Sequence, residues 1–346
     1  MIHIVAHARN LAPILKLTKG PPAIADQIRI HTYQRLFSRQ AVPAGALVFT
    51  DFDLLQSYEL DAAAHMANTV AALRPDLPIL NHPAHATERF DLLDRLYRQG
   101  LNPVEVTRLS GGRAPEHYPL FLRAEDGWAG PETEILADAA ALSRAVDGYS
   151  KAARPTKRRI TVRYCAEPDA DGYFRKYGAF VIGDRIVSQH IMRSQAWVVK
   201  HKKREDDAAF IEEEHRFCEK NPHQTFLLDV AAAGGITFGR IDYGIWRGAP
   251  VVFEINLNPT FPGMKASAAP ERNTRKAVLF PQLAAAFEAV NPGAAASKGE
   301  IATPLDHLPG AQFIEREAWY RDLPHSLLQR ARWQRMRDAR RTRTKG

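Results

Sequence analysis

The sequence is poor in cysteine and has no long apolar run. Cys165 and Cys218 are its only cysteines among 346 residues. Two thiols are too few for a disulfide framework or a multi-thiolate metal site, so we expect both to be buried, in a protein that folds in a reducing compartment. No stretch reaches about 18 consecutive apolar residues, and no basic segment followed by an apolar one opens the chain. We therefore expect a cytoplasmic protein without a membrane span.

Net positive charge is also scarce outside one segment. Residues 326–346 carry seven Arg and one Lys against Asp338, which gives +7 of the total of +8 and leaves +1 for the rest of the chain. We interpret this tail as a solvated, partly helical terminus, with binding to nucleic acid or acidic lipid as the alternative. The remaining, nearly neutral body is long enough for two or three domains.

The pattern of apolar residues predicts an α/β layer followed by an α+β body. Strands are expected at 2–8, 46–52 and 77–81 around a helix at 57–74, which is typical of a small parallel sheet. The strands expected after it are 104–109, 118–123, 160–167, 174–183 and 185–192. The helices expected there are 86–100, 133–146, 205–221 and 224–235. The expected domains are 1–84, 85–150, 151–295 and a C-terminal extension at 296–346.

The segment GRIDYGIWRGAPVVFEIN predicts a hairpin that carries two acids. A turn centred on Gly248 pairs Asp242 with Glu254. The same turn pairs Arg240 with Asn256. Residues two apart share one face of a strand, so these four side chains should project together.

Two carboxylates directly opposite each other repel, at a cost of up to about 1 kcal/mol, and burial would raise the pKa of one of them. A divalent cation with oxygen ligands, typically Mg²⁺, removes this repulsion. Asn256 adds a neutral oxygen to Asp242 and Glu254, so these three are the expected metal ligands. The alternative is an ion pair of Arg240 with one of the acids on a solvated face, which the apolar run VVFEI disfavours.

These residues resemble the metal-binding end of ATP-grasp enzymes such as D-alanine:D-alanine ligases and ribosomal-protein glutamate ligases. GRIDYG, the hairpin and VVFEINLNPTFPGM carry the resemblance. It implies an N-terminal parallel α/β (pre-ATP-grasp) domain followed by a two-lobed ATP-grasp fold. In that family Asp, Glu and Asn in this order hold two Mg²⁺ ions on ATP, with Mn²⁺ as a possible substitute. The resemblance gives these roles to Asp242, Glu254 and Asn256, and places Arg240 at the reacting phosphoryl group.

The resemblance implies ATP contacts on other strands too. Arg123, in YPLFLR, stands where the family has a phosphate-contacting Lys. The alternative for it is a surface ion pair with Glu125 or Asp126. The backbone from Tyr164 to Ala166, in ITVRYCAE, would bind adenine.

An acid of the PDADG turn, Asp171 or Asp169, would hold the ribose, with a role in the turn alone as the alternative. Lys176 is expected to replace the γ-phosphate Arg of the glutamate ligases, whose place matches Gly178. Lys176 shares a strand face with that position, whereas Arg175 points to the other face.

Further cations and a loop complete the implied site. Arg193 and Lys200 are candidates for the γ-phosphate or a substrate carboxylate, with a surface role as the alternative for each. Arg89 is the cation nearest the place of another phosphate-binding Lys of the family. The loop AEDGWAG, with Gly127 and Gly130, would close over the phosphates.

The expected activity is therefore an ATP- and Mg²⁺-dependent ligase that joins a small-molecule or peptide carboxylate to an amine or thiol through an acyl phosphate. A phosphotransferase on the same scaffold is one alternative. A non-catalytic nucleotide-binding protein that uses its basic tail for interaction is another. A homodimer formed through the N-terminal layer is possible, and the two substrates are not readable from the sequence.

Overall fold

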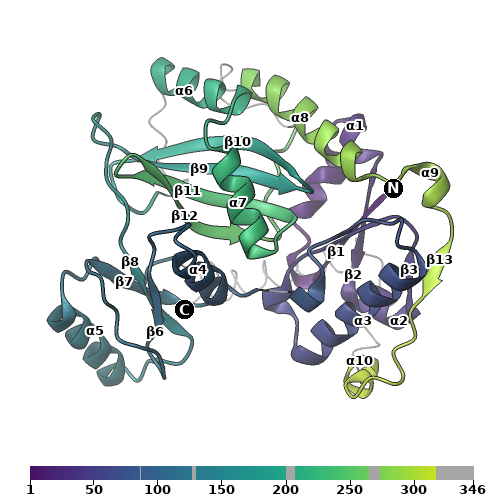
Figure 1. Cartoon of the computed structure of the whole chain (residues 1–346), viewed down its shortest axis with the longest axis horizontal. Coiled ribbons are helices and arrows are strands. Elements are labelled where there is room, and N and C mark those ends of the chain that lie inside the picture. Colours follow the sequence, from purple (N-terminus) through teal and green to yellow (C-terminus); the bar gives the residue numbers. More distant parts are fainter. Residues whose placement is uncertain (86, 127–129, 200–206, 265–272, 317–346) are drawn as a thin grey trace, which may run out of the picture.

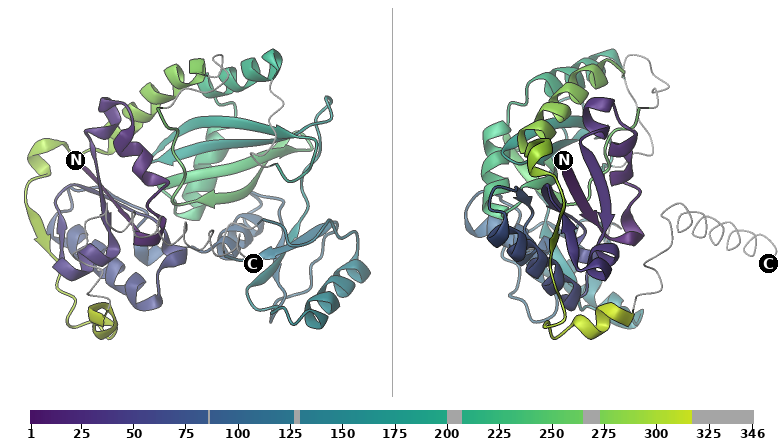
Figure 2. Two further views of the ribbon diagram at one scale, coloured as in Figure 1. Left: turned by 180° about the vertical axis from the view of Figure 1, so that it is seen from behind. Right: turned by 90° about the vertical axis from the view of Figure 1, so that its right-hand side faces the viewer.

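The computed structural model describes residues 1–85, 87–126, 130–199, 207–264 and 273–316. Figures 1 and 2 show three parts: a parallel sheet with its helices, a small antiparallel lobe, and a larger antiparallel sheet. This arrangement confirms the predicted fold class, an N-terminal parallel α/β domain followed by two lobes.

The N-terminal part is a four-stranded parallel sheet of order β2-β1-β4-β5. Its strands are β1 (Ile2–Ala6), β2 (Ile28–Thr32), β4 (Ala46–Phe49) and β5 (Ile79–Leu80). β1 and β4 are buried throughout, because helices cover both faces of the sheet. The covering helices are α2 (Tyr33–Arg39) and α3 (Ser57–Leu73) on one face, and η2 (Ile14–Lys19), α1 (Pro22–Ala25) and α8 (Thr274–Val290) on the other.

The chain returns to this part after α8 and α9 (Gly293–Ala296). β13 (Glu300–Ala302) pairs antiparallel with β3 (Ala41–Pro43), and α10 (Ala311–Arg316) contacts α2 and α3. The beginning of the predicted C-terminal extension is thus packed on the N-terminal part. The basic tail 326–346 lies outside the described residues.

The small lobe is a three-stranded antiparallel sheet of order β6-β8-β7. Its elements are β6 (Val106–Arg108), β7 (Leu120–Ala124), β8 (Arg159–Arg163), α4 (Arg89–Arg98) and α5 (Ala139–Lys151). The predicted boundary after residue 150 is corrected here, since it assigns β8 to the next lobe although β8 pairs with both other strands.

The helix predicted at 133–146 begins later than expected. Asp138 caps α5 by accepting a hydrogen bond from the backbone N–H of Ala141 at 2.8 Å. Before it, Leu136 pairs with Leu120 of β7 through two backbone hydrogen bonds. The segment therefore extends the sheet edge first and turns helical only where an Asp can satisfy the free N–H groups.

The large sheet has the order β10-β9-β11-β12. Its strands are β9 (Phe174–Ile182), β10 (Arg185–Ser194), β11 (Phe238–Trp246) and β12 (Ala249–Asn256). α4, α6 (Ala208–Glu219) and α7 (Gln224–Gly234) pack on one face. The opposite face packs at one end against α8 and the N-terminal sheet, through a core that includes Phe180, Phe238 and Phe261. The rest of that face carries the polar residues of the hairpin.

Asn81 joins the N-terminal sheet to the large sheet. Its Nδ2 donates to the carbonyl oxygens of Phe49 at 3.2 Å and Phe238 at 2.6 Å. Its Oδ1 accepts from the backbone N–H groups of Thr237 at 2.9 Å and Phe238 at 3.0 Å. One buried amide thus fixes the end of β4 beside the start of β11.

Both cysteines are buried, as predicted. Burial raises the pKa of the Cys165 thiol to about 11 and that of Cys218 to about 12, so neither is a reactive thiolate. Among the helices of the described residues, none has the length and apolar character needed to cross a bilayer.

Candidate active site

The open end of the β11–β12 hairpin has the predicted pairing. Asp242 lies opposite Glu254, and Arg240 lies opposite Asn256. Since side chains alternate along a strand, these four residues occupy one face of the large sheet. The sequence prediction of their neighbourhood is confirmed.

Two irregularities cancel to give this register. The turn consists of Arg247 and Gly248, both with positive φ (52° and 77°), and it shifts the pairing one residue away from symmetry about Gly248. A β-bulge then leaves Phe253 without a partner in the ladder, between the pairs Tyr243–Val252 and Asp242–Glu254. The predicted pairing is therefore correct, although the predicted turn is not.

Asp242 is a buried carboxylate held by two cations. Its side chain is 1% exposed, and its oxygens accept from Arg240 Nε at 2.6 Å and Lys176 Nζ at 3.0 Å. Burial by itself raises the pKa of Asp242, but the charges and hydrogen bonds of the two cations outweigh it and hold the pKa below its ordinary value. The ion pair considered as an alternative is present, but it is not on a solvated face.

Glu254 is shared by two arginines of the small lobe. Arg89 Nη2 and Arg123 Nη2 each lie 3.4 Å from its Oε2. Charge-assisted N–H···O bonds are usually about 2.7–2.9 Å long, so both contacts are loose. Burial and the neighbouring Arg89 lower the pKa of Arg123 despite Glu254. These guanidinium groups would gain from a further anion.

The surface ion pairs considered for Arg123 are contradicted. Glu125 pairs with Arg108 at 2.6 Å, and Asp126 pairs with Arg158 at 3.0 Å. Arg123 is only 9% exposed and turns toward the hairpin instead. It stays a candidate for phosphate binding.

Asn256 completes a set of oxygen donors. Its Nδ2 is buried without a hydrogen-bond partner among the described residues. A half-turn of the amide places Oδ1 at the same position, where it becomes an acceptor for a cation. Together with Asp242 and Glu254, it forms the all-oxygen donor set that suits Mg²⁺. The residues present therefore fit the metal that the sequence predicted.

The strand β9 separates its two cations as predicted. Lys176 lies on the face of Asp242, whereas Arg175 lies on the other face and bonds Glu213 of α6 at 2.8 Å. Arg193 pairs with Arg175 in the ladder and bonds Asp207 at 2.8 Å, so it too is on the face away from Asp242. The structure does not bring Arg193 to the site. The β10 residue that pairs with Lys176 shares its face, and Arg193 is the next residue along β10, so its side chain points to the opposite face.

Asp171 lies in the turn before β9. It accepts from the backbone N–H of Tyr173 at 3.1 Å and from Arg175 Nη2 at 2.7 Å. The hydrogen bonds of Arg175 lower the pKa of Asp171 to about 2. These contacts agree with the turn role that the sequence left open.

In the segment after β8, the backbone N–H of Tyr164 already has a hydrogen-bond partner. The N–H of Tyr164 donates to the carbonyl of Pro119 at 2.8 Å, which keeps the strand pairing going. The Tyr164 ring meets Trp197 edge to face at 5.6 Å, and Trp197 also packs on Phe121 at 5.1 Å. Ala166 is half-buried beyond this aromatic group. The Trp197 ring, from the segment after β10, therefore packs directly on the small lobe and the segment after β8.

Sequence reasoning missed Gln189 and His190. A bulge in β10 separates Ser188 from His190, and Gln189 Oε1 there accepts from Arg240 Nη1 at 3.3 Å. Gly178 faces the His190 ring so closely that a Cβ would lie 2.9 Å from it. The bulge is set by the sheet and leaves no mark in the sequence, whereas the glycine in the middle of a strand was a usable signal.

Two predicted elements, Lys200 and the loop AEDGWAG at 124–130, lie wholly or partly outside the described residues. Lys200 and Gly127 are not described. Gly130 is described and has φ of 83°, a conformation that favours glycine.

Asp51 connects the N-terminal sheet to the segment after β12. Its side chain is 2% exposed and accepts from Asn10 Nδ2 at 2.7 Å, from the His7 N–H at 2.9 Å and from Asn258 Nδ2 at 2.9 Å. All three donors are neutral. Burial is the main reason why the pKa of Asp51 rises from 3.8 to about 6, with the charge of Asp53 adding to it.

This raised pKa predicts how stability depends on pH. The folded state binds the Asp51 proton more tightly than the unfolded state, so the contribution of Asp51 to stability should fall as the pH rises from about 4 to about 6. We expect the free energy of unfolding of the wild type, relative to Asp51→Asn, to fall by about 2 kcal/mol across that range. Urea unfolding at several pH values measures it. Asp61→Asn, which alters an exposed carboxylate, should follow the wild type, and a flat difference for Asp51→Asn would contradict the assignment.

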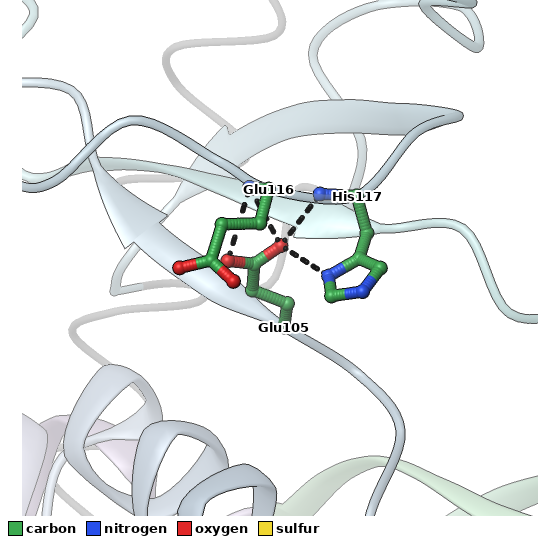
Figure 3. A group of neighbouring side chains, drawn as sticks. All are labelled: Glu105, Glu116 and His117. Atoms are coloured by element: carbon green, nitrogen blue, oxygen red, sulfur yellow. Dashed lines mark hydrogen bonds and ion pairs between the residues drawn. The ribbon is translucent and has the colours of Figure 1, made fainter.

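A second cluster of possible metal ligands lies in the small lobe (Figure 3). It comprises Glu105, Glu116 and His117. The Glu105 carboxylate already accepts from the N–H of His117 at 2.9 Å and from His117 Nδ1 at 3.1 Å. Arg113 Nη1 lies 2.9 Å from Glu105 and 2.8 Å from Glu116, which puts a cation between the two acids. We interpret the cluster as an anchor of the 109–118 loop.

No protein-family model and no curated protein matches the sequence. Among solved structures, the chain is similar to the D-alanine–D-alanine ligase from Bacillus anthracis, with 12% identity over 84% of this chain and 96% of the other and a TM-score of 0.44. It is similar to the ATP-grasp ligase PsnB in complex with a minimal precursor, with 14% identity over 81% and 99% and a TM-score of 0.46. The RimK domain protein ATP-grasp from Sphaerobacter thermophilus gives 14% identity over 84% and 99%, with a TM-score of 0.43.

Proposed function

We propose that the chain is an ATP- and Mg²⁺-dependent ligase that joins a carboxylate to an amine or thiol. The observation that carries the proposal is the opposition of Asp242 and Glu254 on one sheet face, with Asn256 beside them. Each acid is met by two cations. Acids for a metal and bases for phosphates thus occupy one place, which is what a metal–polyphosphate complex requires.

The cations would change partners when ATP binds. Arg89 and Arg123 hold Glu254 only loosely, at 3.4 Å, so a phosphate oxygen can replace the carboxylate. Lys176 and Arg240 hold Asp242 tightly, and they are the cations nearest the acid expected to bind the metal. Bound Mg²⁺ would neutralise phosphate charge and polarise the phosphorus–oxygen bonds. Gln189 keeps Arg240 in place through its 3.3 Å hydrogen bond.

The proposed reaction has two steps. A substrate carboxylate oxygen attacks the γ-phosphorus of ATP, the bond to the β-phosphate oxygen breaks, and an acyl phosphate and ADP result. The amine nitrogen then attacks the acyl carbon, the bond from that carbon to the phosphate oxygen breaks, and the proton lost by the nitrogen passes to the departing phosphate. Neither step forms a bond to the protein, so positioning and charge stabilisation are the whole contribution of the side chains.

Trapping of the acyl phosphate tests this function. We expect that ATP, Mg²⁺ and a panel of carboxylic acids and amino acids, incubated with the protein and hydroxylamine, yield a hydroxamate and an equal amount of ADP for at least one acid. ADP formed with a phosphorylated alcohol and no hydroxamate would establish a phosphotransferase instead. ATP binding without any turnover across the panel would favour a non-catalytic nucleotide-binding protein.

A further inference from the structure

The carboxyl edge of the parallel sheet faces the candidate active site. In the sheet order β2-β1-β4-β5, the chain places β2 on one side of β1 and then places β4 on the other side. The strand order therefore reverses between β1 and β4. Ligands of open α/β sheets bind beyond the carboxyl ends of the strands at such a point. His7 follows β1 there, and Asp51 follows β4. Asn258, from the segment after β12, reaches the same point and bonds Asp51.

Asp51 fixes which way the Asn258 amide points. Asn258 Nδ2 lies 2.9 Å from each Asp51 oxygen and 2.8 Å from the carbonyl oxygen of Asn10. A reversed amide would set its oxygen against three acceptor oxygens, so this orientation is strongly preferred. The Oδ1 of Asn258 must therefore point away from Asp51.

The Oδ1 of Asn258 is buried and has no hydrogen-bond partner among the described residues. A buried carbonyl oxygen without a donor is costly, and such groups in folded proteins usually meet a ligand or a water. Because Asp51 prevents the amide from turning, the missing partner must be a donor of hydrogen bonds or a cation. This is the opposite of what a phosphate or a carboxylate could supply.

Asp53 adds negative charge to the same edge. Its side chain is exposed. Partial desolvation nevertheless raises the pKa of Asp53; the charge of Asp126 also raises it, and the charge of Arg89 lowers it. Asp53 lies two residues after Asp51, in the 3-10 turn Phe52–Leu54, so it belongs to the same edge of the sheet. Its charge is also felt at Asp51. An exposed carboxylate at this edge can receive a ligand from solvent.

Charge is therefore divided between the hairpin and the carboxyl edge of the parallel sheet. The hairpin side carries four cations around its two acids: Lys176, Arg240, Arg89 and Arg123. The sheet side, which we call the acidic edge, consists of Asp51, Asp53 and Asn258. Anionic phosphates and carboxylates suit the first side, and a cation rich in N–H donors suits the second.

We propose that the acidic edge binds the amine substrate as a primary ammonium ion, with Asn258 Oδ1 and the Asp53 carboxylate as its acceptors, and that the ion gives up one proton to solvent before its nitrogen attacks. Asp51 is a positioning residue that acts through Asn258. The inference rests on the ligase function proposed above and adds the chemical class of the second substrate. It also explains why acids from a separate part of the chain lie next to a cationic phosphate site.

Binding of methylammonium, the smallest primary ammonium ion, tests the proposal without ATP. Thermal unfolding of the full chain is followed while methylammonium chloride replaces sodium chloride at constant ionic strength. We expect saturable stabilisation of the wild type and none by tetramethylammonium, which has the same charge but no N–H donor. Equal stabilisation by both ions would overturn the proposal, because it would reveal an ionic effect without recognition of donors.

Four single variants and one double variant sharpen the test. Asp53→Asn, at an exposed position that should not disturb folding, is expected to weaken methylammonium binding roughly tenfold or more. Asp61→Asn, an exposed acid on α3, should bind it like the wild type. Asn258→Ala and Asp51→Asn should each weaken binding, and the double variant should weaken it no further, because Asp51 acts through Asn258. Wild-type binding by Asp53→Asn and Asn258→Ala would overturn the proposal.

ATP binding in the presence of Mg²⁺, measured on Asp53→Asn, separates this inference from the proposed function. We expect wild-type affinity, since Asp53 is not among the cations or metal ligands of the hairpin side. If the wild type itself fails to bind ATP, the ligase function fails, whereas the methylammonium result still decides the nature of the acidic edge.

Discussion

Asp242→Asn is expected to abolish the Mg²⁺ dependence of ATP binding and to lower ATP turnover by about 10²- to 10³-fold. Asp242 is the buried acid of the pair, and the amide cannot supply the charge that a divalent cation needs. The same change leaves Lys176 and Arg240 beside a neutral group, so it should also lower the free energy of unfolding by about 3 kcal/mol. Calorimetric titration with ATP, with and without Mg²⁺, and urea unfolding measure the two effects.

Glu254→Gln keeps this prediction testable if Asp242→Asn folds poorly. Its contacts to Arg89 and Arg123 are long, so little stability should be lost while Mg²⁺ dependence is still reduced. Glu116→Gln, in the cluster of the small lobe, is the matched control and should leave Mg²⁺-dependent binding unchanged. If Glu116→Gln removes that dependence and Asp242→Asn does not, the metal site lies in the small lobe and not on the hairpin.

Phe261→Ala should be strongly destabilising, costing about 3–5 kcal/mol of stability. Phe261 is 1% exposed and lies parallel to Phe180, with ring centroids 4.5 Å apart and an interplanar angle of 2°. It also contacts Phe238 and Phe287, at 6.1 Å each. Because this ring joins α8, the large sheet and the segment after β12, its loss should also loosen the residues that follow Asn258.

Denaturant unfolding of Phe261→Ala compared with Phe313→Ala measures this effect. The Phe313 side chain is 45% exposed, so its removal should change the free energy of unfolding by less than about 1 kcal/mol. Similar losses in the two variants would show that the Phe261 ring is not a shared core contact. A loss confined to Phe261→Ala supports it.

The sequence predicted the hairpin chemistry better than the hairpin geometry. Alternation of side chains and the positions of Asp242 and Glu254 were enough to predict that the two acids face each other. The two-residue turn and the bulge at Phe253 were not predictable, because each depends on how the whole sheet twists and pairs. Their shifts cancel, so a wrong turn still led to the right pairing.

Long-range packing decided the other differences. Arg193 has the right charge for phosphate, but its register opposite Arg175 turns it to the face covered by α6. β8 belongs to the small sheet because β6 and β7 offer it edges on both sides, which no local pattern records. Gln189 reaches Arg240 only because a bulge turns it toward the site.

The sequence by itself determined which polar residues of the hairpin share one face, since residue type and a period of two follow from the chain alone. Only the tertiary structure decided which cation meets which acid, and that Asn258 bonds Asp51 more than 200 positions away. The physical reason is that charge interactions and buried hydrogen bonds depend on distances in space, and distant segments acquire those distances only when their apolar faces pack into a common core.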